Sequence, residues 1–287
     1  LSYKPRISPS ILYVMLDEKF VHSQFNNNND FMVKAAVIFE DVIDEYKTHP
    51  KGAKPRLRLT GKRVEASIDN NLDVIVNDYI FNTYNTDLIN EIVFMGDCAS
   101  WIKAFPNKGF KYHKDLKITF SIDGFHYVQA LEHICTQKYN YLLDSFKDFV
   151  MNDNKQGFIN LCNLMCDNEP YRKDTIIDKQ NYILNNWKYI QNYYHKVFVN
   201  CSMESHISHV FADIFTSRPR AYSKSGLRQI LKLRLLRVNG EDIQKIFFNV
   251  LSDIYSSYNI LSLTFTHKSD YIPSIPFWLK MYLERVT

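Results

Sequence analysis

The sequence has few of the residues that mark special classes of protein, with only eight glycines and five cysteines among 287 residues. So little glycine excludes a collagen-like or low-complexity chain, and a hydrophobic content of 46% excludes a disordered one. The cysteines are odd in number and scattered, which argues against a disulfide framework and predicts reduced thiols. No apolar run approaches the roughly 18 residues that cross a bilayer, and the first ten residues contain no apolar signal region. We therefore expect a soluble, cytoplasmic protein without a membrane partner.

Neither sign of charge dominates. Thirty-five Lys and Arg against 31 Asp and Glu give a net charge of +4, which is too small to identify a partner. The length favours one large domain or one domain carrying an insertion. Because the chain begins with Leu rather than Met, we expect an N-terminal region to be missing.

The first third is typical of β-strands. Three segments rich in β-forming residues, 10–24, 30–44 and 55–68, are separated by turn-forming residues and predict three antiparallel strands. Leu72, Val76 and Ile80 then share one face of a predicted amphipathic helix. Two further apolar strands follow, which break at Gly96-Asp97 and at Asp123-Gly124. The predicted order is β-β-β-α-β-α-β-α, with a carboxylate where the first, fourth and fifth strands end.

A mixed sheet of three antiparallel strands followed by parallel βαβ units is the layout of the ribonuclease H-like fold. Residues 127–201 show helical periodicity instead, which predicts an all-helical insertion. The expected fold class is therefore α/β: a five-stranded ribonuclease H-like core flanked by helices. We expect residues 1–126 to form its first part, residues 127–201 the insertion, and residues 202–287 its last part, with the basic segment and C-terminal helices.

In that topology the fourth strand lies beside the first, so Asp17 and Asp97 become neighbours. Glu204, in the first turn of a predicted helix, is the best-placed third acid. Three clustered carboxylates repel one another unless cations neutralise them, so the cluster predicts bound metal. Oxygen ligands select Mg²⁺ or Mn²⁺, and two such ions catalyse in-line attack on a phosphodiester. Each acid taken alone also fits an ordinary turn or capping role.

Four sequence blocks carry a resemblance to a known family: YVMLDEKFVHSQ, VFMGDCASWIK, IDGFHYVQAL and the long block from Cys201 to Gly240. In this order they resemble the ISLre2 family of bacterial insertion-sequence transposases, also catalogued as UPF0236 and related to the IS256 and Mutator-like group. The resemblance implies a DDE transposase whose triad is Asp17, Asp97 and Glu204. It further implies an Asp-x-x-His motif at Asp123 and His126.

The resemblance also implies that Trp187 is the tryptophan of the insertion, which stacks on a distorted base. An interior anchor of the insertion is the other interpretation of this residue. For Asp123 and His126 a structural bond between strand and helix is as good an explanation as a direct role. His206 and His209 are expected to contact DNA phosphate or to support Glu204, in preference to forming a zinc site with cysteines.

The segment Thr216–Gly240 contains seven cations and no acid. A charged helix face is usually only solvated, but seven unopposed cations after the third acid favour a phosphate track for DNA. These residues are Arg218, Arg220, Lys224, Arg228, Lys232, Arg234 and Arg237.

The sequence thus predicts the catalytic domain of a bacterial DDE transposase, which cleaves DNA at transposon ends and transfers strands with two Mg²⁺ or Mn²⁺ ions. Its expected partners are transposon ends, target DNA and further copies of itself, in the nucleoid. The alternatives are a nuclease of the same fold without strand transfer, a catalytically silent domesticated DNA-binding protein, and a protein unrelated to nucleic acid.

Overall fold

The computed structural model describes residues 8–25, 30–45, 57–110, 116–195, 210–211 and 221–249. The chain divides into a large unit, Leu1–Glu241, and a small one, Asp242–Thr287. In the small unit, residues 243–249 are helical. Among the described residues, no helix has the length and apolar character that a membrane span requires.

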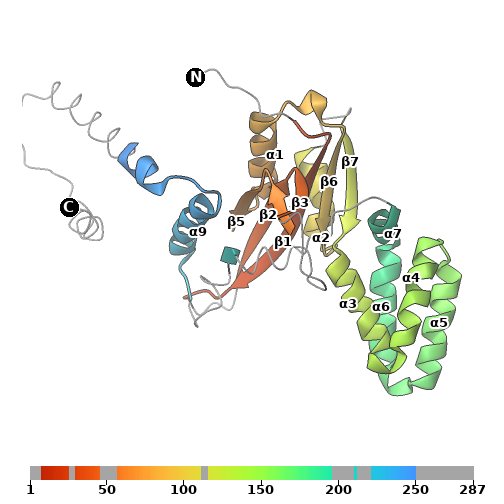
Figure 1. Ribbon diagram of the computed structural model, residues 1–287. Helices are drawn as coiled ribbons and strands as arrows, with labels where there is room; N and C mark the ends of the chain where they lie inside the picture. The colour runs from red at the N-terminus through yellow and green to blue at the C-terminus, as the bar shows by residue number, and fades with distance from the viewer. Residues whose placement is uncertain are drawn as a thin grey trace, which may run out of the picture. The chain divides into compact units, whose positions relative to one another are not determined.

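A five-stranded mixed sheet is the centre of the large unit (Figure 1). Its strand order is β5-β2-β1-β6-β7, with β1 antiparallel to β2, β2 antiparallel to β5, and β6 parallel to both β1 and β7. The predicted five strands and their directions are thereby confirmed. The strands span β1 Ile11–Val21, β2 Phe31–Phe39, β5 Arg63–Ser67, β6 Glu91–Gly96 and β7 Lys117–Ile122.

Two of the predicted strands are shorter than expected. The second and third segments each break, and their outer parts pair as a separate two-stranded sheet of β3 Asp41–Asp44 and β4 Leu57–Thr60. The third segment breaks at Gly61, whose φ of +57° is a turn conformation that glycine adopts without strain. A Cβ there would also collide with the Glu40 side chain, at the point where the second segment bends.

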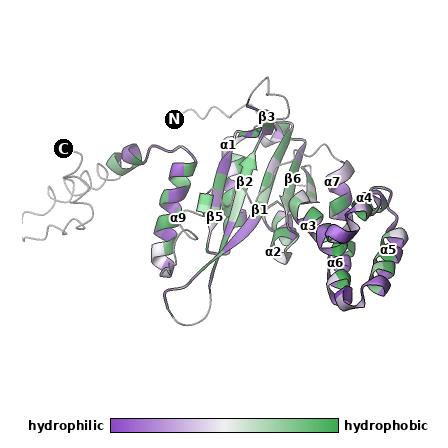
Figure 2. Cartoon of the chain, turned by 60° about the horizontal axis from the view of Figure 1, so that its bottom comes forward, coloured by the Kyte–Doolittle hydropathy of each residue, from purple (hydrophilic) through white to green (hydrophobic). Residues whose placement is uncertain are grey.

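Each face of the sheet has its own hydrophobic core, because successive strand residues point to opposite sides. Figure 2 shows hydrophobic residues concentrated on these central strands. Leu12, Val14 and Leu16 face a core shared with helices α1 Leu72–Thr83 and α2 Ser100–Gly109. As predicted, α1 buries Leu72, Val76 and Ile80.

Tyr13 and Met15 face the opposite core. That core contains Val210 and Phe211, together with Leu227 and Leu231 of helix α9. The basic helix expected after the third acid is therefore confirmed, and it packs against β5 of the sheet. Helix α9 spans Lys224–Val238 and begins at the N-cap Ser223, whose side chain accepts a hydrogen bond from the Gly226 amide.

A helical lobe follows β7 and has a third core of its own. Figure 1 shows α4, α5 and α6 side by side beyond the end of α3. Cys135, Cys162 and Cys166 are buried free thiols in this lobe, and Cys98 is a fourth near the sheet, which confirms the prediction of reduced cysteines for the described residues. The helices of the lobe are α3 Gly124–Cys135, α4 Leu143–Met151, α5 Lys155–Asn168, α6 Lys173–Asn185 and α7 Trp187–His195, with 3₁₀ turns Gln137–Leu142 and Pro170–Arg172; a further 3₁₀ turn, Thr86–Leu88, precedes β6.

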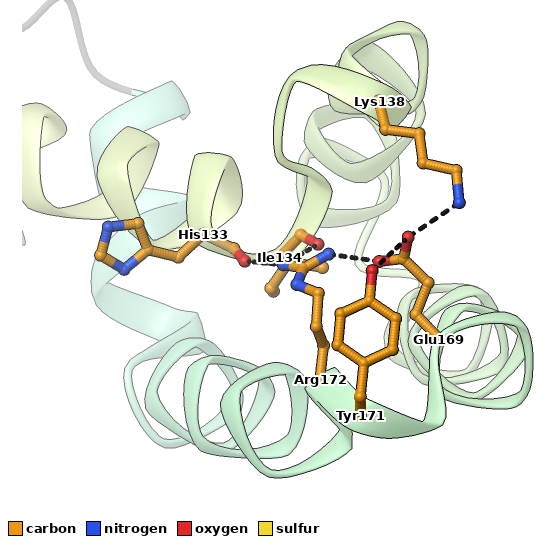
Figure 3. Close-up of polar contacts among 6 residues, drawn as sticks. All are labelled: His133, Ile134, Lys138, Glu169, Tyr171 and Arg172. Atoms are coloured by element: carbon orange, nitrogen blue, oxygen red, sulfur yellow. Dashed lines mark hydrogen bonds and ion pairs between the residues drawn. The ribbon is translucent and has the colours of Figure 1, made fainter.

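A buried carboxylate holds the lobe together at the turn before α6 (Figure 3). Glu169 is 2% exposed and accepts hydrogen bonds from Lys138 at 2.9 Å, Arg172 at 2.7 Å and Tyr171 at 3.2 Å. Arg172 also donates to the carbonyl oxygens of His133 and Ile134, which satisfies the C-terminal end of α3. These cations and hydrogen bonds lower the pKa of Glu169 to about 2. The network thus joins three segments of the lobe through one ionised side chain.

We predict that Glu169→Gln lowers the midpoint of urea unfolding at pH 7. A carboxylate with a depressed pKa in the folded state stabilises the fold above its unfolded value near 4.5, and this stabilisation is lost as the pH falls toward 2. The difference between wild type and variant should therefore shrink on acidification over that range. Asp144→Asn is the control: the Asp144 side chain is 89% exposed and pairs with Lys147, so its substitution should change the midpoint little. Equal effects of the two substitutions would contradict the prediction.

Candidate functional site

Parallel pairing of β1 and β6 brings two distant acids to the centre of the sheet. The register runs from Ile11 beside Glu91 to Met15 beside Met95, after which β6 ends at Gly96 and Asp97 follows. Asp17 lies two residues beyond the last pair on β1. The expectation that the first strand ends at Asp17 is wrong, because pairing with β2 extends β1 to Val21. Asp17 therefore sits where the parallel pairing ends, within a longer strand.

Gly96 permits the close approach of the two strands. A Cβ at this position would lie 2.8 Å from the carbonyl oxygen of Leu16 and 2.8 Å from Cγ2 of Ile102. Both distances are shorter than real Cβ contacts, and the first partner is backbone. Any side chain at position 96 would therefore force the Leu16 backbone or Ile102 to shift.

The turn that carries Asp97 is constrained on both sides. Oδ1 of Asp97 accepts a hydrogen bond from the Ala99 amide at 2.8 Å, and Cys98 between them has a φ of +70°. Left-handed backbone at a non-glycine residue is strained, and such strain is common at functional sites. The Tyr182 hydroxyl of α6 donates to the Asp97 carbonyl oxygen at 2.9 Å, so the helical lobe contacts this turn directly.

The acids influence one another electrostatically. Burial and the neighbouring charge of Asp97 raise the pKa of Asp17 to about 6, against hydrogen bonding from the Glu18 amide and the nearby His126, which lower it. A carboxylate with a pKa this high is only partly stabilised by its protein surroundings when ionised. Ionised Asp17 is therefore less stable in this position than in water.

Asp123 and His126 lie beside the acid pair. Asp123 is 7% exposed and is the N-cap of α3, where its Oδ1 accepts a hydrogen bond from the Phe125 amide at 3.0 Å. Its Oδ2 is 3.5 Å from Nδ1 of His126, which is long for a hydrogen bond and is an ion pair when the imidazole is protonated. Asp123, and then Asp97 and Asp17, raise the pKa of His126. Asp123 thus ties the end of β7 to α3, and His126 contributes positive charge next to the acids.

Sequence reasoning missed a third carboxylate at this edge of the sheet. Glu18 follows Asp17 on β1 and points to the opposite face, where Nε1 of Trp101 donates to its Oε2 at 2.6 Å. Burial and the charge of Asp97 raise the pKa of Glu18, while Lys34 and the Trp101 hydrogen bond lower it. Lys34 also lies over the Trp101 ring, 5.2 Å from its centroid. Strand alternation at the sequence LDEKF was the available signal, because it assigns adjacent acids to different faces.

Several predicted residues lie outside the described ranges: Glu204, His206, His209, Arg218 and Arg220. Within the described ranges, no group of three His, Cys, Asp or Glu side chains is arranged to hold a metal ion. Asp17 and Asp97 supply two hard oxygen donors, which is the donor chemistry that Mg²⁺ and Mn²⁺ prefer.

The described cations of the basic segment are not equally available. Arg228 makes two hydrogen bonds to Asp69, at 2.7 and 3.0 Å, and Lys224 lies 3.4 Å from the same carboxylate. Nε of Arg234 donates to the Val210 carbonyl oxygen at 2.7 Å. The remaining two described cations, Lys232 and Arg237, are exposed on α9.

Trp187 lies in the core of the helical lobe. It is 3% exposed, its ring meets Phe158 edge-on at 5.6 Å between centroids, and its Nε1 donates to Asp153 at 2.6 Å. This environment fits the interior anchor that was the alternative to base stacking.

Comparison with known proteins supplies the family. The profile of an uncharacterised protein family, UPF0236, matches residues 4–249, which is most of the chain. The chain belongs to the UPF0236 family.

Curated UPF0236 proteins of Caldanaerobacter subterraneus subsp. tengcongensis are its relatives. One is 30% identical over 174 residues, covering 60% of this chain and 34% of the relative. Another is 31% identical over 175 residues, covering 60% of this chain and 36% of the relative. The match thus spans about a third of the length of these relatives. A third relative is 29% identical over 174 residues, which are 60% of this chain and 36% of the relative. Its name joins eleven locus names of the same organism. No solved structure matches the chain significantly.

We predict that Gly96→Ala destabilises this UPF0236 protein by about 1–3 kcal/mol, because the added methyl group meets the Leu16 backbone and Ile102. Urea unfolding measures the effect. Gly226→Ala is the matched control: its Cβ would meet only the Ser223 hydroxyl at 3.1 Å and it lies within a helix, so it should be neutral or stabilising. An unchanged unfolding free energy for Gly96→Ala would show that the strands do not require glycine here.

We also predict that Asp17→Asn stabilises the metal-free protein at pH 8. The folded-state pKa of Asp17 is raised from 3.8 to about 6. Asp17 therefore has no effect on folding below about pH 4, opposes folding increasingly between about pH 4 and 6, and opposes it fully above about pH 6. The shift corresponds to a gain of about 2–3 kcal/mol for the neutral isostere at pH 8, which should vanish at pH 4. Urea unfolding in EDTA at the two pH values measures it, with the exposed Asp78→Asn as control. A variant no more stable than wild type at pH 8 would contradict the argument.

Proposed function

We propose that this chain is the catalytic part of a DDE transposase that cleaves DNA at transposon ends and transfers the freed strands. The observation that carries the proposal is the meeting of Asp17 and Asp97 where the β1–β6 pairing ends, with a raised pKa at Asp17. Two neighbouring carboxylates repel each other, and a divalent cation between them removes this repulsion. Such cation sites serve phosphoryl transfer.

The topology supports a ribonuclease H-like core. Numbered along the chain, the five strands of the central sheet lie in the order 3-2-1-4-5, with the second antiparallel to its neighbours and the last two parallel to the first. The helical lobe between β7 and Val210, where the chain packs against the sheet again, is consistent with an insertion into that core.

Asp17, Asp97 and Glu204 are the residues proposed to hold two Mg²⁺ or Mn²⁺ ions. Strand alternation places Asp17 on the same sheet face as Met15, and Val210, which follows Glu204 by six residues, packs on that face. When bound, such ions activate the attacking oxygen and stabilise charge on the phosphate.

The chain's other residues prepare the site. His126 lies 3.5 Å from Asp123 and near the acids, and these negative charges raise the pKa of its imidazole, which stays cationic over a wider pH range than usual. A cation there attracts the phosphate of a nucleic acid. Trp101 holds Glu18 on the opposite face of β1 through a hydrogen bond from its indole nitrogen.

Helix α9 is proposed to contact the DNA backbone. Lys232 and Arg237 are exposed, and the ion pairs of Lys224 and Arg228 with Asp69 are at the surface, where such pairs contribute about 0–1 kcal/mol. Phosphate groups can therefore replace Asp69 as their partner at little cost, which gives binding that weakens with salt. Assembly of several copies on DNA in the bacterial nucleoid is part of the same proposal.

The relatives add an independent argument. The name of one relative joins eleven locus names of a single organism, which fits a gene present in many copies in one genome. An insertion sequence that moves by transposition produces such copies, whereas a resident nuclease does not need them. This observation favours transposition over a nuclease without strand transfer.

The test is cleavage of plasmid DNA that carries the sequences flanking the gene, with Mg²⁺ or Mn²⁺. We predict metal-dependent cutting at the element's ends and joining to target DNA, reduced roughly a hundredfold or more by Asp17→Asn or Asp97→Asn. Asp78→Asn, an exposed acid on α1, is the control and should retain activity. Cutting without joining would favour the nuclease, and salt-sensitive binding without cutting would favour a silent DNA-binding protein. Full activity in Asp17→Asn would refute the catalytic assignment.

A further inference from the structure

The distance between Asp17 and Asp97 is not set by the sheet alone. Paired strands are held about 4.8 Å apart by their hydrogen bonds, but the pairing of β1 with β6 ends at Met15 and Met95. Asp17 lies beyond that last pair, and Asp97 lies in the turn after β6. Gly96 permits the turn to approach β1 closely but does not hold it there. A further contact must therefore keep the two acids at a fixed separation.

The first turn of helix α2 supplies this contact. Nε1 of Trp101 donates a hydrogen bond of 2.6 Å to Oε2 of Glu18. The amide of Glu18 in turn donates to Oδ1 of Asp17 at 2.8 Å, so a single residue links the indole to the acid. The start of the same helix holds the other acid, because Oδ1 of Asp97 accepts a hydrogen bond from the amide of the N-cap Ala99. One helical turn is thus joined to both acids, directly to Asp97 and through Glu18 to Asp17.

The indole that makes this link is itself held in place. Nζ of Lys34 lies over its ring, 5.2 Å from the centroid, and donates a hydrogen bond to Asn70 at 2.9 Å. Lys34 is also the residue opposite Glu18 in the register of β1 and β2. Within α2, Phe105 meets the Trp101 ring edge-on at 6.3 Å between centroids. Side chains that packing and hydrogen bonds hold in one rotamer place their partners precisely.

We propose that Trp101 is a positioning residue, which sets the separation of Asp17 and Asp97 through its hydrogen bond to Glu18. This inference rests on the proposed function and adds to it a residue that acts through another. The separation matters because Mg²⁺ demands near-ideal octahedral geometry, so a shift of about 0.5 Å in one carboxylate weakens its binding. The role requires a donor at position 101 and an acceptor at position 18, and it does not require a charge on Glu18.

The test measures Mn²⁺ binding to the whole chain without DNA, from the electron paramagnetic resonance signal of free Mn²⁺. Trp101→Phe keeps an aromatic ring but removes the donor, and we expect the dissociation constant to rise about tenfold. Trp187→Phe is the matched control, because its Nε1 also donates to a carboxylate, that of Asp153, at 2.6 Å, but within the helical lobe. This control should bind Mn²⁺ as tightly as the wild type.

Two substitutions of Glu18 test the same hydrogen bond from the other side. Glu18→Gln keeps an oxygen acceptor for the indole and should retain most of the affinity for Mn²⁺. Glu18→Leu removes the acceptor and should weaken Mn²⁺ binding as much as Trp101→Phe does. This pair decides the question if Trp101→Phe does not fold. Circular dichroism and urea unfolding establish which variants are folded under the conditions of the measurement.

The outcomes separate this inference from the proposed function. Mn²⁺ binding that is weakened by Asp17→Asn and Asp97→Asn but not by Trp101→Phe would overturn the positioning role alone. An equal loss in Trp187→Phe would assign the effect to general destabilisation and would also overturn it. A loss in Glu18→Gln as large as in Glu18→Leu would assign the effect to the charge of Glu18, with the same consequence. A wild-type chain that binds no Mn²⁺ would overturn both this inference and the proposed metal site.

Discussion

The parallel contact between β1 and β6 is the constraint on which the site depends. Two acids far apart in the sequence meet because Met15 pairs with Met95 and because Gly96 lets the next turn approach the Leu16 backbone. Burial and mutual repulsion then leave Asp17 with a pKa of about 6. A purely structural pair of carboxylates would be stabilised by nearby Arg or Lys, as Glu169 is in the helical lobe. The contrast between these two acids supports the proposal that Asp17 binds a cation.

The helical lobe and the sheet are coupled at that same turn. Tyr182 reaches the Asp97 carbonyl from α6, and Asp123 caps α3 directly after β7. Gly124 is also close to this junction, since a Cβ there would collide with the Tyr193 ring. The lobe is therefore held by contacts within a few residues of the acids. Its own rigidity comes from the Glu169 network and from a core that includes Trp187. A substitution in the lobe can therefore shift the acids through these contacts, even where the substituted residue does not contact an acid.

Much of the sheet was predictable from the sequence because apolar alternation and turn residues act locally. The strands that end at Gly96 and Ile122 and the buried face of α1 follow from such patterns. The full length of β1 could not be predicted in this way. Residues 18–21 are part of the strand because they pair with β2, and this pairing depends on both segments. The split of the second and third segments depended on Gly61 and Glu40 meeting in space. Among the site residues, Asp17 and Asp97 were found from strand order, whereas Glu18 was missed because a contact from α2 gives it its environment.

Charge was the least predictable property. Seven cations without an acid in their own segment look unopposed, yet Asp69, distant in sequence, neutralises two of them and a backbone carbonyl engages a third. Sequence counting cannot see such partners, because they come from another strand or loop. Net charge is equally uninformative about the acid site. There, Lys34 of β2 lowers the pKa of Glu18, and His126 of α3 lowers the pKa values of Asp17 and Glu18. The useful quantity for a nucleic-acid surface is therefore the set of cations that can exchange their partners for phosphate. In this chain the described members of that set lie on α9, which packs against β5 of the sheet that carries the two acids.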